Sequence, residues 1–331
     1  MKKRIVLFAV MICAFLMPLT VKAATLEEPI DIKGNLKSSV DGFNFEYWLQ
    51  NSNEDATMTL TGGGTFESEF NNIFNVLLRT GRRLGSTMPY NELGEITIDY
   101  AAEYTIKSGD VFYICVYGWT VDPVVEWYII ETRGNYKPPG RGIEPLGTIE
   151  VDGGFYEIYE SMRIEQPSII TDKDTFPQYW SIRLGNKTEG TISVSEHFRA
   201  WEEAGLDMSG NMYEVSLCVE GFNSSAEAKI SKYILTIGDD VYGEDTVLLE
   251  TDWYERRAIA DEPAVIDDEP EEIEEPDEID EITGSGEPAG NYDAEGVSVT
   301  GSFAAVYIAA GVAALVVIAA IIIVFAVKRR K

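Results

Sequence analysis

Between Asp41 and Gly238 the chain is a series of short runs rich in β-branched and aromatic residues, separated by Gly, Asn, Asp and Pro. Apolar and polar residues alternate in TISVS and YEIYESMRI, which predicts sheets with one buried face. Only SEHFRAWEEAGL has helical spacing, with Phe198, Trp201 and Leu206 on one side and Gly205 near its end. Many strands and one helix over roughly 200 residues predict a single all-β sandwich.

The segments on either side of this region differ from it in composition. Residues 1–23 begin with MKKR, continue with an apolar run and end in VKA, which is typical of a secretory signal peptide. Residues 24–40 are expected to be a lead-in to the folded domain at 41–238. Residues 239–302 are acidic and punctuated by proline, so we expect them to form a disordered, extended stalk.

A second apolar segment, residues 303–327, carries no charge and is long enough to cross a bilayer as a helix. The basic residues 328–331 follow it directly, and positive residues favour the cytoplasmic side. We therefore expect a single-pass C-terminal anchor that holds the folded domain at the extracellular face of the cell membrane.

The composition excludes several kinds of catalytic and metal site. Its only histidine, His197, has no nearby serine or cysteine nucleophile motif, so neither a histidine-dependent triad nor a histidine-rich metal site is expected. We interpret it as a packing or surface residue. The formal net charge of −30 argues against nucleic acid as a partner. Carboxylates, tyrosines and lysines remain as acid or base candidates, and no cofactor or metal is expected.

Cys115 and Cys218 remain after removal of the signal segment, and both lie in predicted strands. An exported protein meets an oxidising environment in which a disulfide between them is conceivable. Sequence alone does not show whether their Cα atoms approach closely enough. Buried free thiols are the favoured interpretation.

Two glutamates lie within strand-like runs, where a buried carboxylate is costly unless it is used: Glu126 in VVEWYIIE and Glu220 in CVEGFNSS. The turn TVDP joins DVFYICVYGW to VVEWYIIE and predicts a hairpin. Side chains alternate along a strand, so Tyr128 shares the face of Glu126 while Trp127 points away. The apolar neighbours of Glu220 favour a raised pKa. Such a pair suits a glycosidase, in which one carboxylate attacks the sugar carbon and the other protonates the leaving oxygen.

These motifs occur in an order that resembles the family 11 glycoside hydrolases, the β-jelly-roll endo-β-1,4-xylanases, from about Phe43 to Gly238. YGWTVDPVVEWYIIE is similar to the nucleophile hairpin of the family, and VEGFNSS to its acid/base strand. DGGFYEIYESMRIEQPSI resembles the strand and thumb loop, QYWSIR the motif YWSVR, and EHFRAW the single helix. The resemblance implies a jelly-roll sandwich with one α-helix, a concave substrate cleft, and retaining hydrolysis of xylan and xylo-oligosaccharides.

The resemblance also implies roles for individual residues. Glu126 would be the nucleophile and Glu220 the acid/base. The substrate-binding residues would be Trp48, Asn75, Tyr117, Tyr128, Tyr136, Pro138, Arg163, Pro167 and Gln178. An asparagine at position 75, where the family places a contact to the acid/base, implies a near-neutral pH optimum. Phe222, Trp127 and Arg133 depart from the common residues of the family, which puts subsite strength in doubt but not the reaction.

Three other interpretations remain open. A jelly-roll fold alone does not imply catalysis, so the domain could be a non-catalytic carbohydrate-binding module. A β-1,4-glucanase on a related sandwich would need a cleft that accepts the hydroxymethyl group that xylose lacks. An adhesin would be compatible with the C-terminal segments alone.

Overall fold

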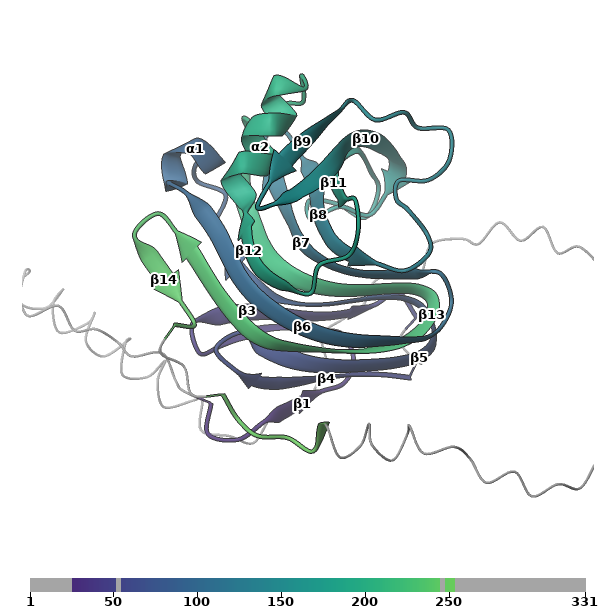
Figure 1. The fold of residues 1–331 in the computed structure, drawn as a ribbon. Coiled ribbons are helices and arrows are strands. Elements are labelled where there is room, and N and C mark those ends of the chain that lie inside the picture. The colour runs from purple at the N-terminus through teal and green to yellow at the C-terminus, as the bar shows by residue number, and fades with distance from the viewer. Residues whose placement is uncertain (1–25, 52–54, 245–247, 254–331) are drawn as a thin grey trace, which may run out of the picture. The chain divides into compact units, whose positions relative to one another are not determined.

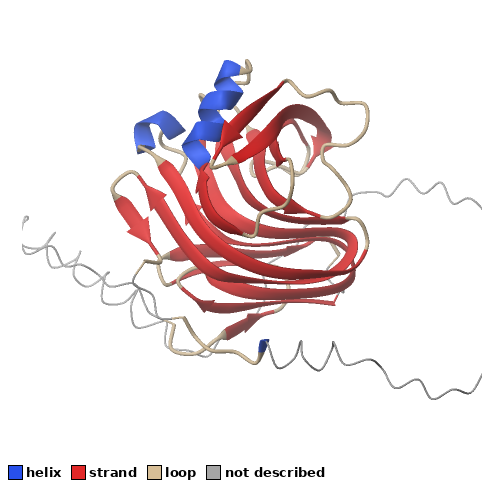
Figure 2. Ribbon diagram, in the orientation of Figure 1, coloured by secondary structure: helices blue, strands red, loops and turns tan. Residues whose placement is uncertain are grey.

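The structure is a computed structural model that describes residues 26–51, 55–244 and 248–253. Within them the chain forms fourteen strands and two helices (Figures 1 and 2). These elements are β1 (Ile30–Ile32), β2 (Leu36–Val40), β3 (Phe43–Leu49), β4 (Asp55–Gly62), β5 (Thr65–Arg83), α1 (Tyr90–Leu93), β6 (Ile96–Ser108), β7 (Val111–Val121), β8 (Val125–Arg133), β9 (Gly147–Val151), β10 (Gly154–Gln166), β11 (Asp174–Arg183), β12 (Glu189–Ser193), α2 (Val194–Glu203), β13 (Asn211–Ile237) and β14 (Asp240–Tyr242). The all-β expectation is confirmed.

Two long strands, β5 and β13, connect the two layers of the sandwich. Residues 65–71 of β5 pair with β4, whereas residues 76–81 pair with β3. Residues 225–237 of β13 pair with β6, and residues 211–222 pair with β7. The pairing therefore gives an outer layer, β1-β4-β5-β13-β6-β12, and an inner layer, β2-β3-β5-β13-β7-β8-β11-β10-β9. The strong curvature of β5 and β13 is visible in Figure 1.

The hydrophobic core lies between these layers. Phe112 on β7 contacts Tyr104 on β6 and Phe70 on β5, with ring centroids 5.2 and 6.5 Å apart. Residues of the inner layer alternate between this core and the opposite face, which carries a second cluster of buried side chains. We call this opposite face the aromatic face; its cluster comprises Leu77, Tyr113, Cys115, Tyr117, Trp119, Tyr128, Ile130, Tyr159, Phe176, Trp180, Ile182 and Cys218.

The predicted helix is α2, and it buries Phe198 and Trp201 as its spacing required. Phe198 packs edge-on against Trp127, with ring centroids 4.9 Å apart. His197 is fully buried edge-on against Tyr156, which makes it a packing residue. The expectation of one helix is wrong in one detail, because α1 forms a single additional turn after Pro89. Four residues are too few to show a helical period.

The sheet extends beyond residues 41–238, the bounds expected from the sequence. β1 and β2 lie within the expected lead-in, and β14 lies within the segment expected to be a stalk. This corrects the stalk prediction for residues 240–242, which pair with the end of β13. Tyr242 packs against Phe43 and lies under the guanidinium of Arg82, and these contacts offset the acidic composition around it.

The other terminal predictions fall outside the described residues. These are the signal peptide at 1–23, the stalk from residue 254, the membrane span at 303–327 and the basic tail. A search of the described residues finds no helix with the length and apolar character that a bilayer crossing requires.

Candidate active site

Glu126 lies on β8, close to the turn from β7. The two strands pair antiparallel, as the hairpin prediction required, with Trp119 opposite Glu126 and Tyr117 opposite Tyr128. Because residues alternate, Tyr128 belongs to the aromatic face while Trp127 belongs to the core. Only 8% of Glu126 is exposed.

Three uncharged donors point at the Glu126 carboxylate. The Tyr117 hydroxyl donates to Oε1 at 2.9 Å, the Tyr128 hydroxyl donates to the same oxygen at 3.2 Å, and Gln178 Nε2 donates to Oε2 at 2.6 Å. Trp119 Nε1 donates in turn to the Tyr117 hydroxyl at 2.5 Å, which leaves the tyrosine proton directed at the carboxylate. An ionised carboxylate can only accept, so this arrangement favours the charged form and orients both of its oxygens.

Gln178 reaches Glu126 because β11 pairs parallel to β8 with these two residues in register. The amide is held in turn by Ser161, whose hydroxyl donates to Gln178 Oε1 at 3.3 Å. Trp180 Nε1 donates to that hydroxyl at 2.9 Å. A chain of hydrogen bonds across β10, β11 and β8 therefore ends on one oxygen of Glu126.

Glu220 lies on β13, the neighbour of β7 on the side away from β8. It stands opposite Leu77 on β5 and Tyr113 on β7, and Trp48 on β3 continues the same cross-strand row. The residue is partly exposed, but its Oε2 is buried and accepts no hydrogen bond among the described residues.

The two carboxyl groups have unequal electrostatic surroundings. Burial and the negative charge of Glu126 raise the pKa of Glu220 to about 8, while Arg163, Arg79 and the nearby Tyr128 hydroxyl act in the opposite direction. Burial also raises the pKa of Glu126, but hydrogen bonds from Gln178 and Tyr117 oppose this effect. At neutral pH Glu220 therefore keeps its proton, and Glu126 is the group arranged to be ionised.

Arg163 and Pro167 lie where β10 leads into the loop 167–173. Arg163 stands opposite Phe176, and its positive charge lowers the pKa of both Glu126 and Glu220. Ile169, two residues after Pro167, packs against the aromatic cluster. The loop is held by Ser168, whose hydroxyl donates to Asp174 at 2.8 Å.

The remaining predicted binding residues lie around the row that contains Glu220. Trp48 is partly buried and packs against the aromatic cluster. Tyr136 is 40% exposed, donates to the Pro139 carbonyl at 3.2 Å, and influences the pKa of Tyr113. Pro138 is buried, so its side chain packs inside the protein and exposes little surface to a substrate.

Asn75 differs in detail from its expected role. It shares the face of Leu77 and stands opposite Phe222, two cross-strand pairs along from Glu220. Its Nδ2 donates to Gln50 Oε1 at 3.3 Å, and the described residues show no hydrogen bond between Asn75 and Glu220. Its Oδ1 is buried and accepts no hydrogen bond there.

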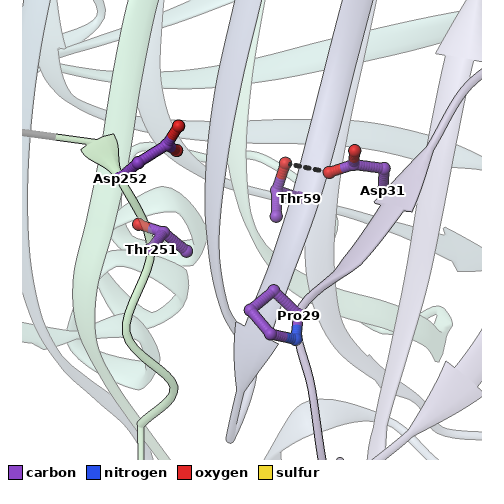
Figure 3. A pocket seen from close by; sticks show the side chains of 5 residues that line it. All are labelled: Pro29, Asp31, Thr59, Thr251 and Asp252. Carbon is purple, nitrogen blue, oxygen red and sulfur yellow. Dashed lines mark hydrogen bonds between the residues drawn. The ribbon is translucent and has the colours of Figure 1, made fainter. Parts of the chain in front are cut away.

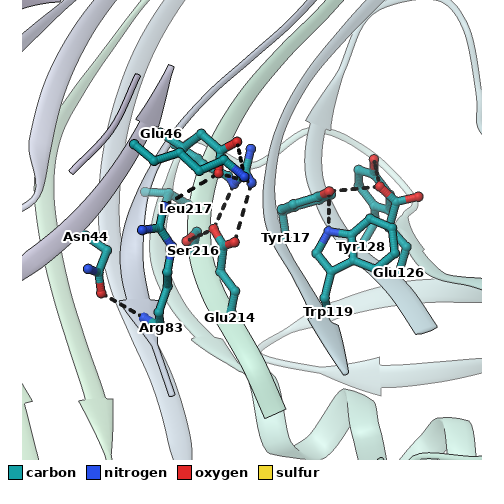
Figure 4. A network of polar contacts seen from close by, with 12 residues as sticks. Asn44, Glu46, Arg83, Tyr117, Trp119, Glu126, Tyr128, Glu214, Ser216 and Leu217 are labelled. Atoms are coloured by element: carbon teal, nitrogen blue, oxygen red, sulfur yellow. Dashed lines mark hydrogen bonds and ion pairs between the residues drawn. The ribbon is translucent and has the colours of Figure 1, made fainter. Parts of the chain in front are cut away.

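Both cysteines carry free, buried thiols, as favoured from the sequence, although Cys115 and Cys218 stand directly opposite each other on β7 and β13. Sequence reasoning missed the charged group beside them, formed by Glu46, Arg79 and Glu214. The two glutamates of this group are labelled in Figure 4. The available signal was the presence of charged residues in otherwise apolar strands.

A hollow of about 420 Å³ lies apart from Glu126 and Glu220 (Figure 3). It is lined by Pro29, Asp31, Thr59, Thr251 and Asp252, with Thr59 Oγ1 donating to Asp31 at 2.7 Å. It contains neither Glu126 nor Glu220.

Comparison with known proteins agrees with this geometry. The model of a family described as glycosyl hydrolases family 11 matches residues 40–231. Endo-1,4-beta-xylanase A from Bacillus pumilus is 43% identical over 208 residues, which cover 63% of this chain and 87% of that protein. An endo-1,4-beta-xylanase A from Thermoclostridium stercorarium is 48% identical over 197 residues, which cover 60% of this chain but 29% of that protein.

Among solved structures, the family 11 xylanase from Neocallimastix patriciarum matches with a TM-score of 0.58 and 33% sequence identity. The match covers 63% of this chain and 99% of that one. This chain spans less than a third of the Thermoclostridium protein. The span matched by the family model contains both Glu126 and Glu220, and the chain belongs to glycosyl hydrolases family 11.

Proposed function

We propose that the protein hydrolyses internal β-1,4-xylosidic bonds of xylan by a retaining double displacement. The observation that carries the proposal is the pairing of unlike carboxyl groups on one face: Glu126 under three donors, and Glu220 with a pKa near 8. The names of the Bacillus and Thermoclostridium relatives supply the choice of xylan.

In the first step Glu126 attacks the anomeric carbon and forms a covalent glycosyl-enzyme, while Glu220 donates its proton to the leaving oxygen. Ester formation removes the negative charge of Glu126. Since that charge is one cause of the raised pKa of Glu220, its loss makes Glu220 a weaker base but leaves it ionised after donation. In the second step Glu220 accepts a proton from the water that attacks the intermediate.

A reducing-sugar assay on soluble xylan tests the reaction with wild-type protein, Glu126→Ala and the control Glu150→Ala. Glu150 is an exposed glutamate on β9 and is expected to be dispensable. Hydrolysis should be lost only in Glu126→Ala. Proton NMR of the first product should show the β-anomer, whereas an α-anomer would contradict the double displacement.

The same assay separates the other interpretations. Binding to xylan without release of reducing ends by the wild type would identify a carbohydrate-binding module. Faster cleavage of cello-oligomers than of xylo-oligomers would identify a glucanase. A protein that neither binds nor cleaves either polymer would leave only the adhesin interpretation.

We propose further that the enzyme is exported and held at the extracellular face of a membrane. Support comes from residues 1–23, which resemble a signal peptide, and from the uncharged residues 303–327 followed by KRRK. Xylanase activity is expected on washed intact cells. Activity found only in the medium would contradict a lasting tether.

A further inference from the structure

A buried arginine separates two buried carboxylates on the inner layer. Arg79 on β5 donates through Nη2 to Glu46 at 2.6 Å and through Nε to Glu214 at 2.7 Å. All three residues are 5% exposed or less. Burial raises the pKa of Glu214, but the charge of Arg79, the hydrogen bonds from Arg79 and Ser216, and the charge of Arg83 together hold that pKa below its usual value. Arg79 therefore stands between two anions.

The same guanidinium also covers a ring that contacts the nucleophile. Arg79 Cζ lies 4.8 Å from the centroid of the Tyr117 ring, and the Tyr117 hydroxyl donates to Glu126 at 2.9 Å. Figure 4 shows Glu46 and Glu214 on one side of Tyr117 and Glu126 on the other. One side chain thus links the ion pairs on β3, β5 and β13 to the nucleophile on β8.

We infer that Arg79 is a positioning residue for the proposed hydrolysis, whose guanidinium holds the Tyr117 ring so that its hydroxyl stays directed at Glu126. The geometry requires arginine. Its nitrogens donate in two directions while its central carbon lies over the ring, and a lysine ammonium cannot make all these contacts at once. A buried ion pair is weak evidence for stability, since apolar residues of similar volume often serve as well. The contact with Tyr117 gives the ion pairs of Arg79 with Glu46 and Glu214 a functional role, which is to fix the guanidinium over the Tyr117 ring.

The charge of Arg79 also acts on Glu220, whose pKa it lowers. The charged and titratable groups around these two residues come from every neighbouring strand: Lys37 on β2, Glu46 on β3, Arg83 on β5, Tyr113, Cys115 and Tyr117 on β7, Glu126 and Tyr128 on β8, Arg163 on β10, and Glu214 and Cys218 on β13. Loss of Arg79 removes one cation from this set, and loss of Glu214 removes one anion.

The inference rests on the proposed hydrolysis and is tested through the pH dependence of kcat/KM on a soluble xylo-oligosaccharide. Arg79→Met should lower kcat/KM roughly tenfold, because Tyr117 is no longer held. Its alkaline limit, set by protonated Glu220, should move up by about half a pH unit, since a nearby cation is lost. Glu214→Gln should move the same limit down. Arg79→Lys keeps the charge, so its limit should remain near that of the wild type while kcat falls.

The matched control is Arg82→Met. Arg82 lies on the opposite face of the same strand and covers the Tyr242 ring at 4.5 Å, so it offers the same kind of contact away from the carboxylates. Its pH profile should be that of the wild type. If Arg79→Met folds, by circular dichroism, and keeps both the wild-type rate and limits, the inference is wrong.

If Arg79→Met does not fold, Arg79→Lys decides, because it keeps the charge and removes the guanidinium that lies over the Tyr117 ring. A wild-type kcat in that variant would overturn the inference. Absence of hydrolysis by the wild type would instead refute the proposed function.

Discussion

Gln178 offers the cleanest test of how Glu126, the proposed nucleophile, is kept ionised. Its amide donates to Glu126 Oε2 at 2.6 Å, the shortest of the three contacts, and it is itself only 9% exposed. Gln178→Met keeps the length of the side chain and removes the donor. The hydrogen bonds from Tyr117 and Tyr128 to Oε1 remain in place.

The expected shift of the acid limit in Gln178→Met follows from the strength of this buried hydrogen bond. A hydrogen bond to a charged group contributes about 1.5–3 kcal/mol, and one pKa unit corresponds to about 1.4 kcal/mol. Complete loss of this hydrogen bond would thus raise the pKa of Glu126 by roughly one to two units. Because two donors remain on the other oxygen, we expect the acid limit of kcat/KM to rise by about one unit. The direction is upward because the lost donor had stabilised the ionised form.

The assay is initial-rate hydrolysis of xylan or a chromogenic xylo-oligosaccharide across the pH range, with wild type, Gln178→Met and Gln166→Met. Gln166 lies at the end of β10; its amide donates to the Ile164 carbonyl instead of to a glutamate, and its Oε1 accepts a long hydrogen bond from Arg163 at 3.5 Å. The control should keep the wild-type acid limit. If Gln178→Met also keeps it, the three-donor account of Glu126 is refuted, whatever happens to kcat.

Three further predictions concern other parts of the fold. Asn75→Asp should move the acid limb of the pH–rate curve downward, because the new carboxyl group would lie on the face of Glu220 and the two groups would titrate as a coupled pair; an unchanged profile would contradict this. Burial lowers the pKa of His197 to about 3, so the native state keeps it neutral while the unfolded chain binds a proton below about pH 6.5. The free energy of unfolding should therefore fall as pH drops from about 6.5 towards 3. Urea unfolding at pH 7 and pH 4.5 should show a smaller decrease in this free energy for His197→Phe than for the wild type. Equal decreases in the two proteins would contradict this prediction. Gly118→Ala would place a Cβ 2.1 Å from a backbone oxygen of β13 and should cost roughly 1–3 kcal/mol or more in thermal unfolding, whereas Gly147→Ala, with open space around it, should not.

Local patterns were sufficient for much of the fold and for the surroundings of Glu126. The hairpin of β7 and β8 follows from a turn motif between two apolar runs, and alternation alone places Glu126 and Tyr128 together. The ends of the domain were harder to predict. β14 has three residues in an acidic context, and its packing partner Phe43 lies about two hundred positions earlier in the sequence.

Long-range register limited what could be said of the rest of the site. Arg79 meets Glu46 at a separation of 33 residues and Glu214 at 135, and no local pattern pairs such positions. Asn75 lies on the face of Glu220, but its hydrogen bond goes to Gln50, a residue with no distinguishing sequence context. Alternation along a strand predicts which face of the sheet a residue lies on. Its neighbours on that face depend on the register between strands that are distant in sequence.

The uninterrupted pairing of β13 with β7 from Glu214 to Phe222 has a consequence for how this gene can vary. Irregularities in register occur between Met212 and Glu214, and again between Ser224 and Ala226, but none interrupts the segment between them. An insertion or deletion of one codon inside that segment would exchange the faces of all residues beyond it. Glu220 would turn into the core, and Val219 after an insertion, or Gly221 after a deletion, would take its place on the face of Glu126. Length changes should therefore be tolerated at the two flanking irregularities and eliminated between them.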